Sequence, residues 1–254
     1  MILKHNAFFN GIGGFCLAAK QEGIETVATV EIDEWCNKQS KRHFPDAIQF
    51  TDINTVTSLP FADIWSGGFP CQDASNARTH SSGGKHTGHG VDGARTGLWW
   101  SWLELIKTHR PQIIVGENVT AIRSKGLDKI LQSLAEIGYD AEWCDLSASE
   151  FGAPHSRART WVVAYPHGFG RGEESIIFSQ IVGRPIPQAP EWEPSRAICS
   201  TYRKKTLPEA YGIHDGLPRK LDKGGLDPEI KAYGNAIAPP VARAIFRAIK
   251  EVLL

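Results

Sequence analysis

A cysteine and a carboxylate each follow directly after an apolar run of this sequence. Cys71 stands in residues 66–72, Ser-Gly-Gly-Phe-Pro-Cys-Gln, and Glu117 stands in residues 116–119, Gly-Glu-Asn-Val. A lone cysteine is most often a small buried hydrophobic residue, but here the flanking glycines and proline argue against a place inside a regular element. A thiolate next to a group that transfers protons would suit covalent catalysis.

Two arginines, Arg157 and Arg159, precede a later apolar run. Because residues i and i+2 of an extended chain point to the same side, their positive charges would lie together. The pair could supply positive charge to the site; the alternatives are a solvated edge of the sheet and a phosphate clamp.

A third group of residues indicates a nucleoside ligand. The first apolar run ends in residues 9–14, Phe-Asn-Gly-Ile-Gly-Gly, and glycines after a strand let the backbone approach a ligand at a helix N-terminus. The spacing is not the full G-x-G-x-x-G, so an ordinary glycine turn fits equally well. The second run ends at Glu31, where an acid can bind a ribose diol, whereas Asp33 would be the better helix N-cap. NAD and S-adenosylmethionine both remain open at this point.

These residues need strands and helices to position them. Continuous apolar runs predict strands that are covered on both faces, as in a parallel sheet, at Leu3–Phe9, Glu25–Val30, Ala62–Ser66, Gln112–Val115 and Thr160–Ala164. Apolar residues at helical spacing predict helices over 97–109, over 127–137 with a stop at Gly138, and after Pro239-Pro240. This alternation predicts a doubly wound α/β sheet with ligands at the carboxyl ends of its strands.

Composition limits the alternatives. The chain has 254 residues, 28 Lys+Arg against 28 Asp+Glu, and 41% hydrophobic residues, which is typical of a globular protein without a general basic coat. Its start does not read as a signal peptide, and no run reaches the roughly 18 apolar residues of a membrane span. The five scattered cysteines, without C-x-x-C or suitably spaced histidines, favour the reducing cytoplasm over disulfides and do not predict a metal site.

The chain changes character after Ala164. Residues 165–226 are rich in Pro, Gly, Ser and charge, with little periodicity. We therefore expect residues 1–164 plus 227–254 to form one cofactor-binding catalytic domain, and residues 165–226 a small separate segment.

In their order along the chain, the motifs resemble those of the cytosine-C5 DNA methyltransferase family. The family's glycine motif resembles residues 9–14, its ribose-binding acid Glu31, and its adenine-contacting pair Asp52-Ile53. Its Pro-Cys-Gln, Glu-Asn-Val, Arg-x-Arg and Gly-Asn motifs match residues 70–72, 117–119, 157–159 and 234–235. The resemblance covers almost the whole chain apart from the middle segment, and it suggests a small, phage-type member.

The resemblance implies a Rossmann-like S-adenosylmethionine-dependent methyltransferase sheet with a small irregular target-recognition subdomain. It implies that Cys71 adds to C6 of a flipped cytosine, that Glu117 offsets charge at N3, and that Arg157 and Arg159 help to lower the pKa of the thiol. The cofactor-binding residues it implies are Phe9, Gly11, Gly13, Gly14, Glu31, Asp52, Ile53, Pro70, Leu98, Asn235 and Ala236. The substrate-binding residues it implies are Gln72, Ser75, Arg95 and Asn118.

The expected partner is double-stranded DNA, with a cognate restriction endonuclease, a monomeric state and no membrane. Residues 76–97, rich in glycine and histidine, resemble a loop that closes over the flipped base, although the family's usual Ser-x-Ala-Gly-Lys-Arg run is replaced here. Residues 196–231 carry eight Lys and Arg against five Asp and Glu, suited to phosphate contacts or simply to a solvated face. Methylation of cytosine in RNA, a catalytically silent DNA-binding protein, and a remote NAD dehydrogenase are the alternatives.

Overall fold

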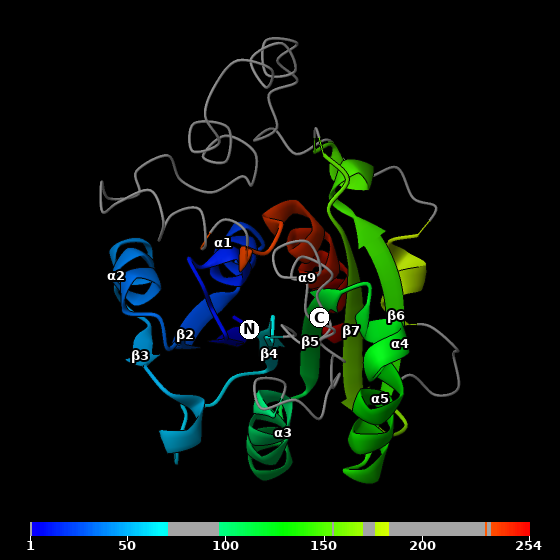
Figure 1. Ribbon diagram of the computed structural model, residues 1–254, viewed down its shortest axis with the longest axis horizontal. Coiled ribbons are helices and arrows are strands. Elements are labelled where there is room, and N and C mark those ends of the chain that lie inside the picture. Colours follow the sequence, from blue (N-terminus) through cyan, green and yellow to red (C-terminus); the bar gives the residue numbers. More distant parts are fainter. Residues whose placement is uncertain (1, 71–96, 154, 170–175, 183–231, 233–234) are drawn as a thin grey trace, which may run out of the picture.

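The computed structural model describes residues 2–70, 97–153, 155–169, 176–182, 232 and 235–254. One seven-stranded sheet runs through it in the order β3-β2-β1-β4-β5-β7-β6 (Figure 1). The strands are β1 (Lys4–Phe8), β2 (Glu25–Val30), β3 (Ile48–Phe50), β4 (Ile64–Gly67), β5 (Ile113–Val119), β6 (Tyr139–Ser147) and β7 (Ala158–Pro166). The first five are parallel, so their carboxyl ends meet along one edge, which we call the carboxyl edge. A Rossmann-like α/β sheet is thereby confirmed.

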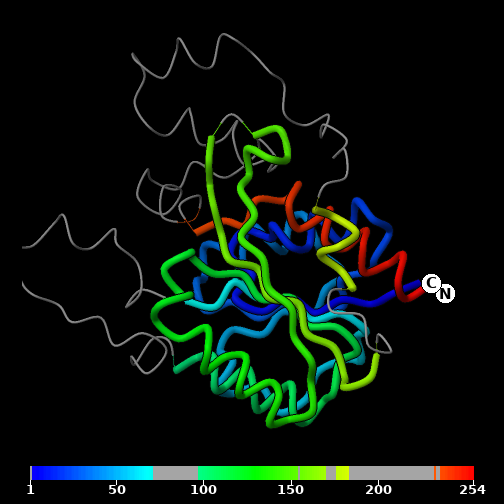
Figure 2. Tube along the Cα trace, turned by 90° about the vertical axis from the view of Figure 1, so that its right-hand side faces the viewer, coloured from blue at the N-terminus to red at the C-terminus, as the bar shows by residue number. Residues whose placement is uncertain are grey.

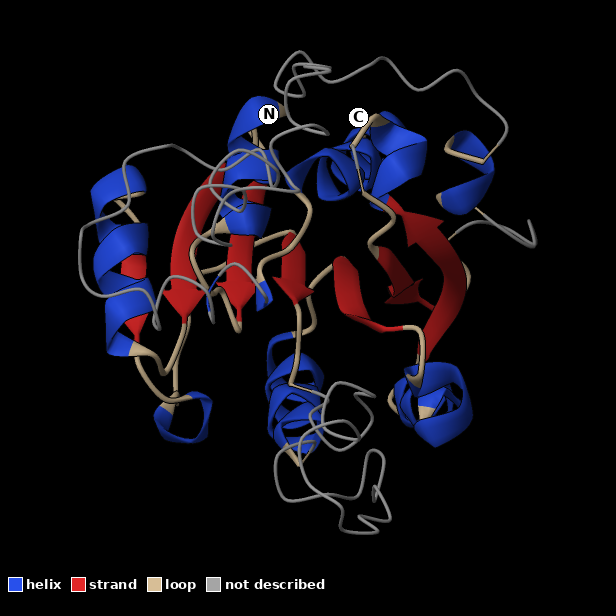
Figure 3. Cartoon of the chain, turned by 45° about the horizontal axis from the view of Figure 1, so that its top comes forward, coloured by secondary structure: helices blue, strands red, loops and turns tan. Residues whose placement is uncertain are grey.

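Helices cover both faces of this sheet (Figure 3). The described helices are α1 (Gly14–Gln21), α2 (Glu34–His43), α3 (Leu98–His109), α4 (Ile122–Lys125), α5 (Leu127–Glu136) and α9 (Pro239–Leu253), with 3-10 turns η1 (Ile53–Thr55), η4 (Ala148–Phe151) and η5 (Phe178–Gln180). One core cluster joins α1 and α9 to one face, and a second joins α3 and α5 to the other. The Glu22 carboxylate at the end of α1 fixes α9, because it accepts hydrogen bonds from Arg243 at 2.7 Å and Arg247 at 2.9 Å.

The last two strands depart from the expected parallel sheet. β7 runs antiparallel to both β5 and β6, and β6 and β7 lie side by side along their length (Figure 2). The parallel direction expected for Thr160–Ala164 is therefore wrong. β6 alternates polar and apolar residues at the end of the sheet, so it has no continuous apolar run to mark it.

A buried carboxylate anchors the chain where it leaves the sheet. Glu142 on β6 accepts backbone N–H bonds from Ile176, Ile177 and Phe178 at 3.2, 2.8 and 3.0 Å. The side chains of these residues and of Ile181 lie in the α9 core cluster. Residues 176–182 are thus packed onto the catalytic core just before the stretch 183–231, which lies outside the described residues. No helix among the described residues has the length and apolar character to cross a membrane.

Candidate active site

The glycine loop and Glu31 meet at the carboxyl edge between β1 and β2. Glu31 Oε2 accepts the backbone N–H of Gly11 at 2.7 Å, and Oε1 accepts that of Asp33 at 2.8 Å. Asp33 is the N-cap of α2 and accepts the N–H of Cys36 at 3.1 Å, as its position predicts. Burial raises the pKa of Glu31, while the two N–H groups act in the opposite direction. Glu31 therefore faces the glycine loop and is not the helix cap.

The glycine loop leaves open space beside this carboxylate. Gly11 has φ +51°, and a β-carbon there would have no atom within 4 Å. Gly13 has φ +92° and caps α1 without a side-chain hydrogen bond, which leaves backbone N–H groups directed outward. Phe9, also at positive φ, packs its ring edge-on to Trp102 with centroids 6.0 Å apart.

The other expected cofactor residues lie along the same edge. Asp52 caps η1 by accepting the N–H of Asn54 at 2.9 Å, and Ile53 is buried beside it. Pro70 follows β4, Leu98 begins α3, and Asn235 and Ala236 precede α9. Ile32 is exposed beside Glu31, where it could contact a ligand, and it was not among the expected site residues. The signal in the sequence was an apolar residue directly after Glu31.

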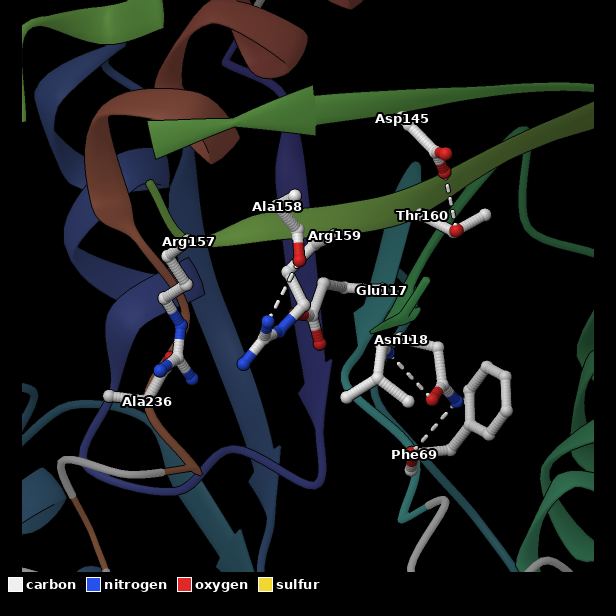
Figure 4. A network of polar contacts seen from close by, with 10 residues as sticks. Phe69, Glu117, Asn118, Asp145, Arg157, Ala158, Arg159, Thr160 and Ala236 are labelled. Atoms are coloured by element: carbon white, nitrogen blue, oxygen red, sulfur yellow. Dashed lines mark hydrogen bonds and ion pairs between the residues drawn. The ribbon is translucent and has the colours of Figure 1, made fainter. Parts of the chain in front are cut away.

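Asn118 holds the loop that leads to the expected nucleophile. Its Nδ2 donates to the carbonyl of Phe69 at 3.2 Å, and its Oδ1 accepts the N–H of Val119 at 2.9 Å (Figure 4). The Phe69 ring packs against Trp99, with centroids 5.1 Å apart. Phe69 is thus held by both its carbonyl and its ring, two residues before Cys71. Cys71, Gln72, Ser75 and Arg95 themselves lie outside the described residues.

Glu117 and Arg159 form an ion pair at the carboxyl edge. Arg159 Nε lies 3.0 Å from Glu117 Oε1, and the Glu117 side chain is only 11% exposed. Arg159 pairs with Val119 across β5 and β7, which makes it a diagonal neighbour of Glu117 on the same face. Burial raises the pKa of Glu117, and Arg159 and Arg157 partly oppose that shift. The site therefore holds a carboxyl group that takes up a proton more readily than an exposed one.

Arg157 lies on the same side of the strand but reaches a different group. Its Nη2 donates to the carbonyl of Ala236 at 2.8 Å, while its charge still acts on Glu117 (Figure 4). The arginine pair thus divides its contacts, since Arg159 holds the carboxylate and Arg157 holds the segment before α9.

A second polar contact lies beside the ion pair, and the sequence did not indicate it. Thr160 donates to Asp145 Oδ1 at 2.6 Å, and Arg123 on α4 lies 2.9 Å from Asp145 Oδ2. Because Asp145 and Thr160 face each other across β6 and β7, only the strand pairing reveals this contact. Within the described part of the chain, no group of three or more His, Cys, Asp or Glu is arranged to hold a metal ion.

Known proteins are similar to this chain in sequence. The family model for C-5 cytosine-specific DNA methylase matches residues 3–181. The type II methyltransferase M2.BsuMI of Bacillus subtilis (strain 168) is 34% identical over 186 residues, which cover 70% of this chain and 45% of that protein. M.NgoBI of Neisseria gonorrhoeae is 29% identical over 209 residues, 78% of this chain and 62% of that protein. The chain thus spans about half the length of such relatives.

Solved structures show the same fold. A structure described as a DNA modification methyltransferase encoded within a prophage (E. coli) matches with a TM-score of 0.70 at 16% identity, over 99% of both chains. The S. pombe Dnmt2 methyltransferase matches with a TM-score of 0.67 at 15% identity, over 99% of this chain and 100% of that one. The solved structures show that the fold is shared, and the family model shows that the sequence is related. This chain belongs to the C-5 cytosine-specific DNA methylase family.

Proposed function

We propose that this protein is an S-adenosylmethionine-dependent DNA (cytosine-5-)-methyltransferase that works through a covalent bond between Cys71 and C6 of a flipped cytosine. One observation carries the proposal: a β-carbon at Gly68 would lie 3.2 Å from Glu117 Oε2, so the loop that leads to Cys71 passes directly against the buried carboxyl group. This supports a site in which a nucleophile and a proton-transferring group act together, the arrangement that covalent catalysis requires.

The carboxyl edge fits the cofactor. A carboxylate has about four lone-pair sites, and Glu31 uses two of them on Gly11 and Asp33, which leaves acceptors for a ribose diol. Ile32, 75% exposed, offers an apolar surface next to it for a purine ring. Glu31, the open space at Gly11 and the end of α1 would hold S-adenosylmethionine, with Asp52, Ile53, Pro70, Leu98 and Asn235 along the same edge. When bound, it supplies the electrophilic methyl group that C5 accepts.

The chain's own residues prepare the cytosine. The Cys71 thiolate forms a bond to C6, and the electron pair of the C5–C6 double bond moves into the ring, where it enriches C5. Glu117 gives or shares a proton at N3 and so offsets the negative charge; its raised pKa suits this role. Arg159 keeps the carboxyl group in place, and Asn118 holds the carbonyl of Phe69. Once C5 has accepted the methyl group, a water molecule takes the C5 proton. The C5–C6 double bond then re-forms as the C6–S bond breaks and releases the Cys71 thiolate, and the proton at N3 returns to Glu117.

We further propose that residues 165–226 contribute target recognition, with residues 176–182, which pack into the core cluster of α9, as an attachment to the core. Gln72, Ser75 and Arg95 would contact the DNA substrate. We propose a monomer that acts in the cytoplasm beside a cognate restriction endonuclease.

The experiment combines Cys71→Ala with DNA that carries 5-fluorocytosine, which blocks proton loss at C5. The wild-type protein with S-adenosylmethionine should form an adduct that survives denaturing electrophoresis, and bisulfite sequencing of plasmid from an expressing host should show methylated cytosines. Cys71→Ala should do neither while it binds the cofactor normally. Unchanged methylation by Cys71→Ala would contradict the mechanism, and methyl transfer to structured RNA but not to duplex DNA would contradict the substrate.

A further inference from the structure

Three parts of the active site converge on the short segment Ala236–Ala238. This segment is buried, with residues only 4–6% exposed, and it leads directly into α9. Arg157 donates to the carbonyl of Ala236 at 2.8 Å. The cofactor loop and the loop before Cys71 approach the same segment from its other sides, at Ile237. Ile237 did not stand out in the sequence, where only the glycines opposite it hinted at a close approach.

Ile237 fills the space between two glycines on different loops. A β-carbon at Gly14, the first residue of α1, would lie 3.0 Å from both the Cβ atom and the carbonyl oxygen of Ile237. A β-carbon at Gly68 would lie 3.0 Å from its Cδ1 atom. Both distances are too short for comfortable carbon contacts, whose optimum is about 3.5–4.0 Å. The backbone of Ile237 thus limits the cofactor loop, whereas the tip of its side chain limits the nucleophile loop.

The position of Gly68 matters for chemistry because of its neighbours. Gly68 stands three residues before Cys71, and the same β-carbon would also lie 3.2 Å from Glu117 Oε2. The Ile237 side chain and the Glu117 carboxyl group therefore both crowd the side of Gly68 on which a β-carbon would stand. The φ angle of Gly68 lies outside the left-handed region, so its backbone conformation does not require a glycine. The crowding at the β-carbon position is the reason for a glycine here.

We propose that Ile237 is a positioning residue whose Cδ1 methyl group seats the Gly68–Pro70 loop against Glu117 and so sets the place of the nucleophile. The inference rests on the proposed function, since it assigns the spacing that the covalent step needs. Arg157 supports this role because it donates to the carbonyl of Ala236, while Arg159 forms the ion pair with Glu117.

The test exchanges volume between the two sides of the contact. Gly68→Ala should slow adduct formation with 5-fluorocytosine DNA about tenfold or more, because overpacking a tight site costs that much. Ile237→Val removes only Cδ1 and should restore part of that rate in the double variant, because the approach to Glu117 Oε2 at 3.2 Å remains. In Gly68→Ala and in the double variant, the dissociation constant of S-adenosylmethionine should stay within about twofold of the wild-type value. A merely structural role for Ile237 would change cofactor affinity together with the rate of adduct formation.

Gly14→Ala supplies the matched control. Its clash involves Ile237 Cβ and the carbonyl oxygen, atoms that valine retains, so Ile237→Val should not rescue it. Equal rescue of both alanine variants, a fully active Gly68→Ala, or a double variant as slow as Gly68→Ala would overturn the inference. If the wild-type protein forms no adduct and methylates nothing, the proposed function fails instead. The same cycle measured in unfolding free energies then still decides whether Ile237 sets the space at Gly68.

Discussion

The proposed cofactor region, around Glu31 and Gly11, and the proposed catalytic edge, around Glu117 and Arg159, are built in different ways. In the cofactor region, Glu31 bonds to Gly11 and Asp33, backbone groups of the loops that end its own strand and the neighbouring one. At the catalytic edge, Glu117 depends on Arg159, a side chain from an antiparallel strand about 40 residues away. The first arrangement follows from local loop geometry, whereas the second requires the strand order to be correct. A substitution should therefore affect binding in one region and chemistry in the other.

The largest expected effect is at the catalytic edge. Arg159→Ala should lower kcat by about 10²–10⁴-fold, the usual contribution of a well-placed proton-transfer group, because Glu117 loses its partner. Cofactor affinity, measured by calorimetry, should change little. Arg159→Lys keeps the charge but not the planar guanidinium geometry, so its kcat should lie between those of the wild type and Arg159→Ala. A loss of cofactor affinity as large as the loss of kcat would erase the distinction between the regions.

The pH dependence sharpens the same comparison. A catalytic proton on Glu117 makes the rate fall as pH rises through the pKa of this group, which burial places above its usual value. Arg159 lowers that pKa, so Arg159→Ala should raise it and move the falling limb of the pH–rate profile to higher pH. Glu31→Gln should leave this limb in place. A shift to lower pH in Arg159→Ala would contradict the role of Glu117 as proton carrier.

The next effect concerns the cofactor region. Glu31→Gln should weaken S-adenosylmethionine binding by about 10- to 100-fold, as expected for hydrogen bonds to a charged group, while kcat at saturation stays nearly unchanged. Equilibrium binding and steady-state kinetics measured on the same preparation separate these quantities. Asp33→Asn, which keeps an N-cap acceptor for α2, is the matched control and should bind normally. An effect of Glu31→Gln on kcat alone would refute its ribose role.

A separate effect concerns the stability of the sheet, and neither binding nor chemistry. His5 on β1 is fully buried between Thr26 of β2, at 3.0 Å, and Ser66 of β4, at 2.7 Å. Burial lowers its pKa to about 3, so the unfolded chain binds more protons than the folded one between pH 6.5 and that value. Stability should therefore fall on acidification through this window, by up to about 1.4 kcal/mol per pH unit from this group alone.

His5→Gln provides the comparison, because glutamine does not titrate. Urea unfolding between pH 7 and 4 should show a shallower decline of unfolding free energy for this variant, whatever its stability at pH 7. Parallel curves for the two proteins would show that folding does not shift the pKa of His5, and would contradict its burial as a neutral side chain.

Local pattern predicted much of this fold. β2 has its expected bounds, and α3, α5 and α9 begin within about one residue of their expected starts, because apolar periodicity and proline mark them. β6 was missed and β7 was given the wrong direction, since strand direction depends on contacts that no single segment encodes.

The candidate site divides in the same way. Glycines and acids at strand ends indicated the proposed cofactor region. In the structure, the Glu31 carboxylate accepts the backbone N–H of Gly11 in the glycine loop. The division of labour between Arg157 and Arg159 could not be predicted, because the partner of Arg157 is a backbone carbonyl 79 residues away. The roles of all the site residues stay predictions, and Cys71, Gln72, Ser75 and Arg95 also lie outside the described residues.

Both attachment points of the middle stretch are immobilised on the core. Glu142 fastens residues 176–178 on one side, and Arg157 with Ile237 fastens residues 236–238 on the other. A replacement stretch of different length or origin would thus enter and leave the core at the same two places, and the chemistry between them would be shielded from the change. Under the proposed role of this stretch in target recognition, DNA specificity could then diversify by exchange of this stretch alone, with the proposed catalytic residues unchanged.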